Sequence, residues 1–254
     1  MNNGPYIDAG MMQLDQATPD ILALGDSWFW WHVNNLLIPI WNLYNIPKVI
    51  LTQGGAGAEA RELAKGGNLT AFKTTLKGSP TLKAVLLSAG GNDFAGRKHM
   101  SRILRPDCSN AATGEDCFKP DEIHELLSVE VLDAYRTLVG SVTEHRPEAH
   151  VYVHNYDYAI PTGIGILGFG HWLKDPMDRV GVPGPVQPLA VNYLINTFSD
   201  MLVQLQSEFP DHVVFIDSTN VLSAGDWANE LHPKAGGFDK LVDKAWAPEL
   251  ANLP

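Results

Sequence analysis

The sequence has no long hydrophobic run, fewer basic than acidic residues, and only two cysteines. None of its apolar stretches approaches the roughly 18 residues that a membrane-spanning helix needs, so we expect no stable membrane insertion. There are 18 Lys and Arg against 29 Asp and Glu, which gives a formal net charge of −11. Because proteins that bind nucleic acids carry clustered Lys and Arg for the phosphate backbone, we expect no nucleic-acid partner.

The two cysteines, Cys108 and Cys117, lie in a polar stretch typical of a surface loop. Two alternatives stay open: a disulfide in an oxidising compartment, or two free thiols. No histidine is close enough to complete a cysteine-based ligand set, and the 9 histidines show no paired spacing, so we expect no metal site. The first residues lack the basic start and apolar core of a signal peptide, which predicts a cytoplasmic protein, or a secreted one where a leader has been removed.

Short apolar runs alternate with helical stripes along the chain. Five runs bounded by Gly, Pro or Asp predict buried strands at 21–24, 48–51, 82–87, 150–153 and 213–216. Apolar residues at three-to-four spacing predict helices around 127–142, 194–205 and 238–246. This alternation predicts an α/β protein: a three-layer α/β/α sandwich around a five-stranded parallel sheet, in a single domain over residues 1–254.

Two segments, 94–120 and 159–188, are longer than ordinary connections. The second is rich in glycine and apolar residues from residue 160 to residue 172. Long loops in compact domains usually serve a function, so we expect both segments to lie over the active site.

Residues suited to acyl transfer follow the predicted strands. The first strand is followed by Ser27, the second by Gly57 and the third by Asn92, while His232 precedes the last helix. Ligands of an open parallel sheet bind beyond the carboxyl ends of its strands, so we expect these residues to meet at one edge. There a serine can attack a carbonyl, a histidine can take the serine proton, and amide N–H groups can receive the oxyanion.

The same residues carry a family resemblance. In order and spacing, the chain resembles the four sequence blocks of the SGNH (GDSL-type) hydrolases at Gly25-Asp26-Ser27-Trp28, Gly57, Gly91-Asn92-Asp93 and His232-Pro233. The resemblance implies a flavodoxin-like sandwich and no cofactor. It implies that Ser27 is the nucleophile, that His232 is the general base, and that Ser27, Gly57 and Asn92 form the oxyanion hole. No lipase-type Gly-x-Ser-x-Gly elbow surrounds Ser27, which argues against an ordinary α/β-hydrolase.

The chain departs from this family at one position. The family usually has an aspartate three residues before the histidine, and this chain has Asn229. Three interpretations stay open: Asn229 orients His232, a nearby carboxylate (Asp226 or Glu230) replaces it, or a backbone carbonyl suffices. We favour Asn229 because it stands at the matching position.

Substrate-binding candidates surround the nucleophile in the sequence. Trp28 is its neighbour, and Phe169 and Trp172 come from the long glycine-rich segment, which together predict an apolar pocket for an acyl or aryl group. His154 ends the fourth strand at the same edge, and it either contacts the substrate or supports the residues that contact it.

These expectations converge on a serine esterase for small to medium carboxylic esters of the acyl or aryl type. Its partner would be a small-molecule ester, handled without a metal or organic cofactor. A carbohydrate O-deacetylase, a lysophospholipase or a thioesterase would use the same residues, because the pocket and loops determine the substrate. The alternative from another class is a catalytically weak protein that binds an ester or a glycan.

Overall fold

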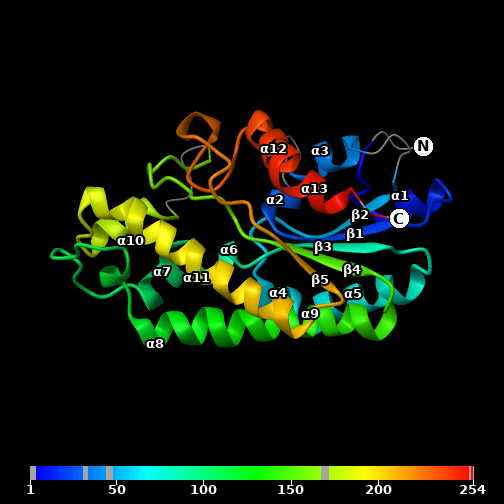
Figure 1. Ribbon diagram of the computed structural model, residues 1–254, viewed down its shortest axis with the longest axis horizontal. Coiled ribbons are helices and arrows are strands. Elements are labelled where there is room, and N and C mark those ends of the chain that lie inside the picture. The colour runs from blue at the N-terminus through cyan, green and yellow to red at the C-terminus, as the bar shows by residue number, and fades with distance from the viewer. Residues whose placement is uncertain (1–3, 31–33, 44–47, 167–171, 252, 254) are drawn as a thin grey trace.

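The computed structural model describes residues 4–30, 34–43, 48–166, 172–251 and 253. Its centre is a parallel sheet with the strand order β2-β1-β3-β4-β5, the flavodoxin-like order (Figure 1). The strands are β1 (Ile21–Gly25), β2 (Ile50–Gly54), β3 (Ala84–Ser88), β4 (His150–His154) and β5 (Val213–Ile216). The predicted α/β fold and its five parallel strands are confirmed.

The strand positions follow from burial and pairing. β1 and β3 are buried along their whole length, as apolar strands covered on both faces must be. β2 begins and ends later than the predicted 48–51, because its register against β1 pairs Leu24 with Gln53 and Gly25 with Gly54. Gly54 has φ +106°, and a Cβ atom there would lie 2.1 Å from the Gly25 carbonyl oxygen, so only glycine fits at this end of the two strands.

Helices cover both faces of the sheet (Figure 1). One layer contains α5 (Gly66–Gly78), α9 (Leu132–His145) and α11 (Gln187–Glu208), and the other contains α3 (Leu37–Asn42), α12 (Ala235–Leu241) and α13 (Ala247–Leu250). The predicted helices at 127–142, 194–205 and 238–246 all lie in these layers. The first continues from a π-helical turn, His124–Val131, into α9, and the last runs from α12 through a second π-helical turn, Val242–Trp246. The short α1 (Ala9–Leu14) precedes β1 in the chain.

Three short helices start where strands end and bring residues to the carboxyl edge of the sheet. They are α2 (Ser27–Trp30) after β1, α4 (Ala60–Leu63) after β2, and α6 (Gly91–Phe94) after β3. In the part of the chain that the structure describes, no helix is long and apolar enough to cross a membrane.

The two long segments are partly helical rather than simple loops. Segment 94–120 contains α7 (Arg97–Ile103), a 3₁₀ turn at Glu115–Cys117 and the first residue of α8 (Pro120–Ile123), and segment 159–188 contains α10 (Lys174–Arg179) and a 3₁₀ turn at Gly184–Val186. The sequence signal for α7 is weak, since only Met100 and Ile103 are buried in this helix.

The stretch between the two cysteines is mostly exposed, as a surface loop is. Cys108 and Cys117 themselves are buried free thiols. Their burial raises the pKa of Cys117 to about 12, with the thiol of Cys108 contributing, so neither group is an activated thiolate.

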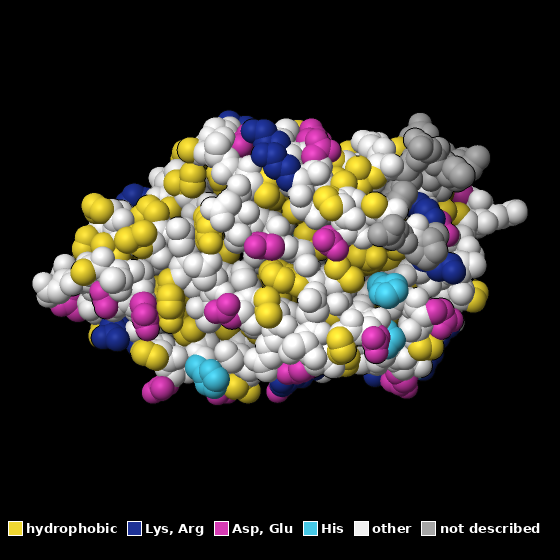
Figure 2. Space-filling view, in the orientation of Figure 1, with side chains coloured by type: hydrophobic (Ala, Val, Ile, Leu, Met, Phe, Trp, Pro, Cys, Tyr) yellow, Lys and Arg dark blue, Asp and Glu magenta, His cyan; other side chains and the backbone are white. Residues whose placement is uncertain are grey.

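Charged side chains are dispersed on the face shown in Figure 2. Acidic residues are scattered over it, and Lys and Arg form small separate groups rather than one continuous basic surface. This distribution agrees with the negative net charge.

Candidate active site

The turn after β1 is built around a buried carboxylate. Asp26 Oδ1 accepts hydrogen bonds from the Trp28 backbone N–H at 2.9 Å and from the Ser88 hydroxyl at 3.0 Å, while its Oδ2 accepts one from the Tyr156 hydroxyl at 2.7 Å. Burial raises the pKa of Asp26 to about 6. Because its oxygens are engaged by the turn, by β3 and by the segment after β4, Asp26 holds the Ser27 backbone in place.

Ser27 and His232 lie in direct contact although 205 positions separate them. The distance between Ser27 Oγ and His232 Nε2 is 2.7 Å. Burial lowers the pKa of His232 to about 4, so its imidazole is neutral at neutral pH. A neutral imidazole with its Nε2 lone pair toward a hydroxyl has the arrangement of a general base and its nucleophile.

Asn229 settles the tautomer of this histidine. Asn229 Oδ1 lies 2.9 Å from the backbone nitrogens of both Leu231 and His232, and 3.0 Å from His232 Nδ1. Backbone N–H groups can only donate, so the amide atom that faces them is the oxygen. His232 Nδ1 must then carry the proton, which leaves the Nε2 lone pair for the Ser27 hydroxyl. The Asn229 amide oxygen therefore accepts the hydrogen bond from a protonated His232 Nδ1.

The two carboxylates considered as substitutes for Asn229 have other partners. Asp226 bonds the Ser223 N–H and hydroxyl at 2.8 and 2.7 Å and pairs with Lys240 Nζ at 2.7 Å. Glu230 is fully buried, and its carboxylate accepts hydrogen bonds from the segment around Trp172. The geometry thus favours Asn229 over either carboxylate.

The expected oxyanion-hole residues come from three strand ends. Gly57 has φ +79°, a left-handed conformation that glycine adopts without strain. Among the described residues, neither the Ser27 N–H nor the Gly57 N–H has a hydrogen-bond partner. The Asn92 amide nitrogen donates to the Ala58 carbonyl at 3.2 Å and lies 3.5 Å from Asp26 Oδ2. Asn92 is therefore held between the Gly57 loop and the Ser27 turn.

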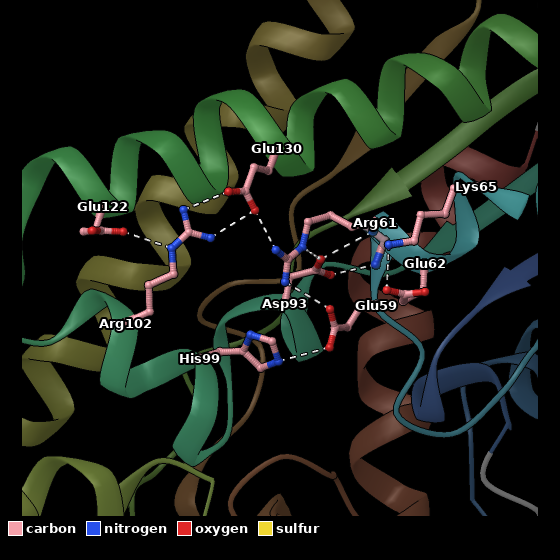
Figure 3. A network of polar contacts seen from close by, with 10 residues as sticks. Glu59, Arg61, Glu62, Lys65, Asp93, His99, Arg102, Glu122 and Glu130 are labelled. Atoms are coloured by element: carbon pink, nitrogen blue, oxygen red, sulfur yellow. Dashed lines mark hydrogen bonds and ion pairs between the residues drawn. The ribbon is translucent and has the colours of Figure 1, made fainter.

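A polar network that the sequence did not reveal fixes this side of the site (Figure 3). The fully buried carboxylate of Asp93, next to Asn92, accepts hydrogen bonds from the Ala60 N–H at 2.6 Å and from Arg61 Nε at 2.8 Å. Arg61 also pairs with Glu130 of the π-helical turn. The network extends to Glu59, His99, Arg102 and Glu122. It joins α4, which follows the loop that carries Gly57, to α6, which carries Asn92.

An apolar pocket opens beside Ser27. It encloses about 40 Å³, and its walls come from α2, α6, α11 and the segment after β4. Trp28 lines it as expected, with its indole N–H donating to the Leu231 carbonyl at 2.9 Å. The other apolar wall residues were not expected from the sequence: Phe94, Ala95, Ala159, Leu173, Val191, Leu194, Ile195, Trp227 and Leu231.

The remaining substrate-binding candidates lie in different places. His154 has no exposed surface and sits among the rings of Trp28, Phe29 and Trp246, outside the pocket wall. Trp172 makes an edge contact with His232, with ring centroids 6.0 Å apart. Phe169 lies outside the described residues.

The described residues contain no group of three or more His, Cys, Asp and Glu side chains that could hold a metal ion.

Comparison with known proteins identifies the fold. No protein-family model and no curated protein matches the sequence. Solved structures do match. An extracellular lipase from Streptomyces rimosus has 16% identity and a TM-score of 0.57, and a carbohydrate acetylesterase from Sinorhizobium meliloti has 16% and 0.55. An aryl esterase from M. smegmatis has 14% and 0.55. Each match covers 93% of this chain and 100% of the other. The chain therefore has the fold of SGNH-type esterases and lipases, as its sequence blocks predicted.

Proposed function

We propose that this protein is a serine esterase that hydrolyses small to medium carboxylic esters through an acyl-enzyme on Ser27. The observation that carries the proposal is the hydrogen-bonded line from Ser27 Oγ through both ring nitrogens of His232 to Asn229 Oδ1. At its Ser27 end, this line of hydrogen bonds meets an apolar pocket. The chain also shares its fold with proteins named as lipase, acetylesterase and aryl esterase.

In the first half of the reaction, Ser27 Oγ attacks the ester carbonyl carbon and its proton passes to His232 Nε2. The carbonyl oxygen becomes an oxyanion that receives hydrogen bonds from the Ser27 and Gly57 N–H groups and from the Asn92 side chain. When the tetrahedral intermediate collapses, the bond to the alcohol oxygen breaks and His232 gives its proton to that oxygen. The alcohol leaves, and the acyl group stays on Ser27.

The second half repeats these steps with water. His232 Nε2 takes a proton from water as the water oxygen attacks the acyl carbonyl carbon. The oxyanion forms in the same place, the bond to Ser27 Oγ breaks, and the proton on His232 returns to Ser27. The products are one carboxylic acid and the free enzyme, so Asn229 has to keep the Nδ1 proton in place throughout.

The pocket supports an acyl or aryl group as the part of the substrate that is recognised. Its walls are apolar and its volume of about 40 Å³ is small. Burying an acyl chain there gains about 0.8 kcal/mol for each methylene group, until the chain outgrows the space. A short acyl chain therefore fits better than a fatty acid.

A fluorophosphonate probe combined with a series of p-nitrophenyl esters tests the proposal. We expect the probe to label Ser27, as peptide mass spectrometry would identify, and we expect turnover of the acetate and butyrate esters. Ser27→Ala should abolish labelling and lower kcat by about 10⁴-fold or more. The control is Ser101→Ala, since the exposed Ser101 hydroxyl donates a hydrogen bond to the Arg97 carbonyl of its own helix. Ligand binding without labelling or turnover would instead indicate the ester- or glycan-binding protein.

A further inference from the structure

Glu230 is a buried carboxylate, and in the part of the chain that the structure describes its hydrogen bonds all come from the backbone of one distant segment. Its side chain has no exposed surface. Glu230 Oε1 accepts hydrogen bonds from the N–H groups of Gly163 and Lys174 at 2.8 and 2.9 Å, and Oε2 accepts them from Trp172 and Leu173 at 2.9 and 3.1 Å. The Glu230 N–H in turn donates to the Ile164 carbonyl at 3.1 Å. Both parts of the segment, 163–164 and 172–174, are thus tied to this one residue.

The chemistry of these contacts requires a carboxylate. A charged group is costly to bury unless hydrogen bonds replace its hydration, and an ionised carboxylate offers about four lone-pair positions and no donor. Four N–H groups occupy those positions here. Glutamine at this position would present an NH₂ group to backbone donors, so the isosteric amide could satisfy only part of the set.

The backbone that Glu230 holds carries two side chains of the site. The Trp172 ring packs edge-on against His232, at 77° and 6.0 Å between centroids. The next residue, Leu173, is buried and lines the pocket beside Ser27. The Trp172 carbonyl also accepts a hydrogen bond from the Gly96 N–H at 3.0 Å, which ties this backbone to the start of α7.

We propose that Glu230 is a positioning residue that holds Trp172 against His232 and Leu173 in the pocket wall, and thereby sets which esters the site accepts. The ester selectivity in this statement rests on the function proposed above, whereas the anchoring of the backbone does not. The turn that presents the histidine to Ser27 and the wall that shapes the pocket are one connected unit, because Glu230 lies between Asn229 and His232 in the chain.

The test compares Glu230→Gln and Glu230→Asp with the parent protein, and uses Asp239→Asn as the control. Asp239 is exposed on α12, so its substitution removes the same charge nearby without touching the segment. Amide hydrogen exchange reports on the backbone of residues 172–174 without any substrate. We expect exchange there to be about tenfold faster or more in Glu230→Gln, since a hydrogen bond to a charged group contributes roughly 1.4 kcal/mol or more. Glu230→Asp should give an intermediate value.

Kinetics then report on the side chains. We expect KM for the preferred p-nitrophenyl ester to rise about tenfold in Glu230→Gln, with a smaller fall in kcat and a flatter preference among acyl chain lengths. The pH at which kcat/KM falls on the acid side should stay unchanged. A shift of that pH would mean that the Glu230 charge acts on His232 directly, and would overturn the positioning role.

Further outcomes test the anchoring of the backbone and the ester selectivity separately. Unchanged exchange at residues 172–174 would contradict the anchoring. If Glu230→Gln fails to fold, Leu173→Ala and Trp172→Ala take its place, and parental chain-length profiles in both would overturn the selectivity. If the parent hydrolyses no ester, the selectivity falls with the proposed function, while the anchoring is still decided by the exchange measurement.

Discussion

The two sides of Ser27 are built in different ways. On one side lie His232, Asn229 and Asn92, whose side chains are each fixed by hydrogen bonds of 2.7 to 3.5 Å. On the other side lies a pocket wall that includes Val191, Leu194 and Ile195 of α11, which are held by apolar packing. The first side depends on the positions of individual atoms, and the second depends on volume.

This difference predicts how each side responds to substitution. A polar group aimed at a developing charge contributes several kcal/mol to the transition state, because its position is set before the reaction begins. An apolar wall discriminates by only about 0.8 kcal/mol for each methylene group. Changes on the polar side should therefore alter turnover by powers of ten, and changes on the apolar side should alter preference by small factors.

The largest effect among the following variants is expected for Asn92→Ala. Loss of one oxyanion-hole donor should lower kcat by about 10²–10³-fold with little change in KM, as measured with p-nitrophenyl acetate. Asn68→Ala is the matched control, because the Asn68 side chain donates an exposed hydrogen bond to the Glu62 carbonyl. Thermal unfolding of both variants shows whether the Ala58 contact of Asn92 matters for stability. A fall in kcat of less than tenfold would remove Asn92 from the oxyanion hole.

Substitution of Asn229 should have a smaller effect. Asn229→Ala removes the neutral hydrogen bond to His232 Nδ1, together with those that Asn229 Oδ1 accepts from the backbone N–H groups of Leu231 and His232. We expect kcat to fall about tenfold, far less than in Ser27→Ala or His232→Ala. A fall as large as in those two variants would contradict the view that Asn229 only orients the ring. No fall at all would mean that a backbone carbonyl suffices.

The pH dependence of kcat/KM also tests how Asn229 acts on His232. Only the neutral form of His232 can accept a proton, and burial lowers its pKa to about 4, so kcat/KM should persist below pH 6 and fall as the pH drops through about 4. Asn229→Asp places a carboxylate beside Nδ1, which favours the charged ring and moves this fall to higher pH. Asp226→Asn is the control and should leave the profile in place. A fall near pH 6 that Asn229→Asp does not move would point to Asp26, whose pKa burial raises to about 6.

The polar side could be predicted from the sequence because its residues stand in local patterns. Ser27 lies two residues after the end of buried strand β1 and Asn92 four residues after the end of β3, and parallel strands bring their carboxyl ends to one edge. The five strands and the helices around 127–142, 194–205 and 238–246 were predictable for a similar reason. The strands are short apolar runs, and the helices have apolar residues at three-to-four spacing. The boundaries of the strands were harder to predict. β2 is shifted relative to the predicted 48–51, because its pairing with β1, and not its composition, sets where it ends.

The pocket wall, the polar network of Arg61 and the contacts of Glu230 could not be predicted, because they depend on residues far apart in the chain. Val191 and Leu194 belong to a helical stripe that indicates a core face, and nothing in that stripe distinguishes the positions that also line a pocket. Arg61 meets Glu130 across 69 positions. Glu230 looked like a possible partner for His232, and only the structure shows that its acceptor positions are taken by another segment.

The smallest effect is expected in the pocket wall, from the same substitution at two positions of α11. Val191 is buried and lines the pocket, whereas Val203 is 51% exposed on the same helix. Val191→Ala should raise kcat/KM for a longer acyl ester relative to the acetate by roughly fourfold, which corresponds to about 0.8 kcal/mol for one additional buried methylene group. Val203→Ala should leave the ratio unchanged, and the acetate rate itself should change little in both variants. An unchanged ratio in Val191→Ala, in a protein that unfolds at the parental temperature, would mean that the acyl group binds elsewhere. A large loss of acetate turnover would instead show that the two sides of Ser27 are coupled, because a change in volume would then have moved the atoms that react.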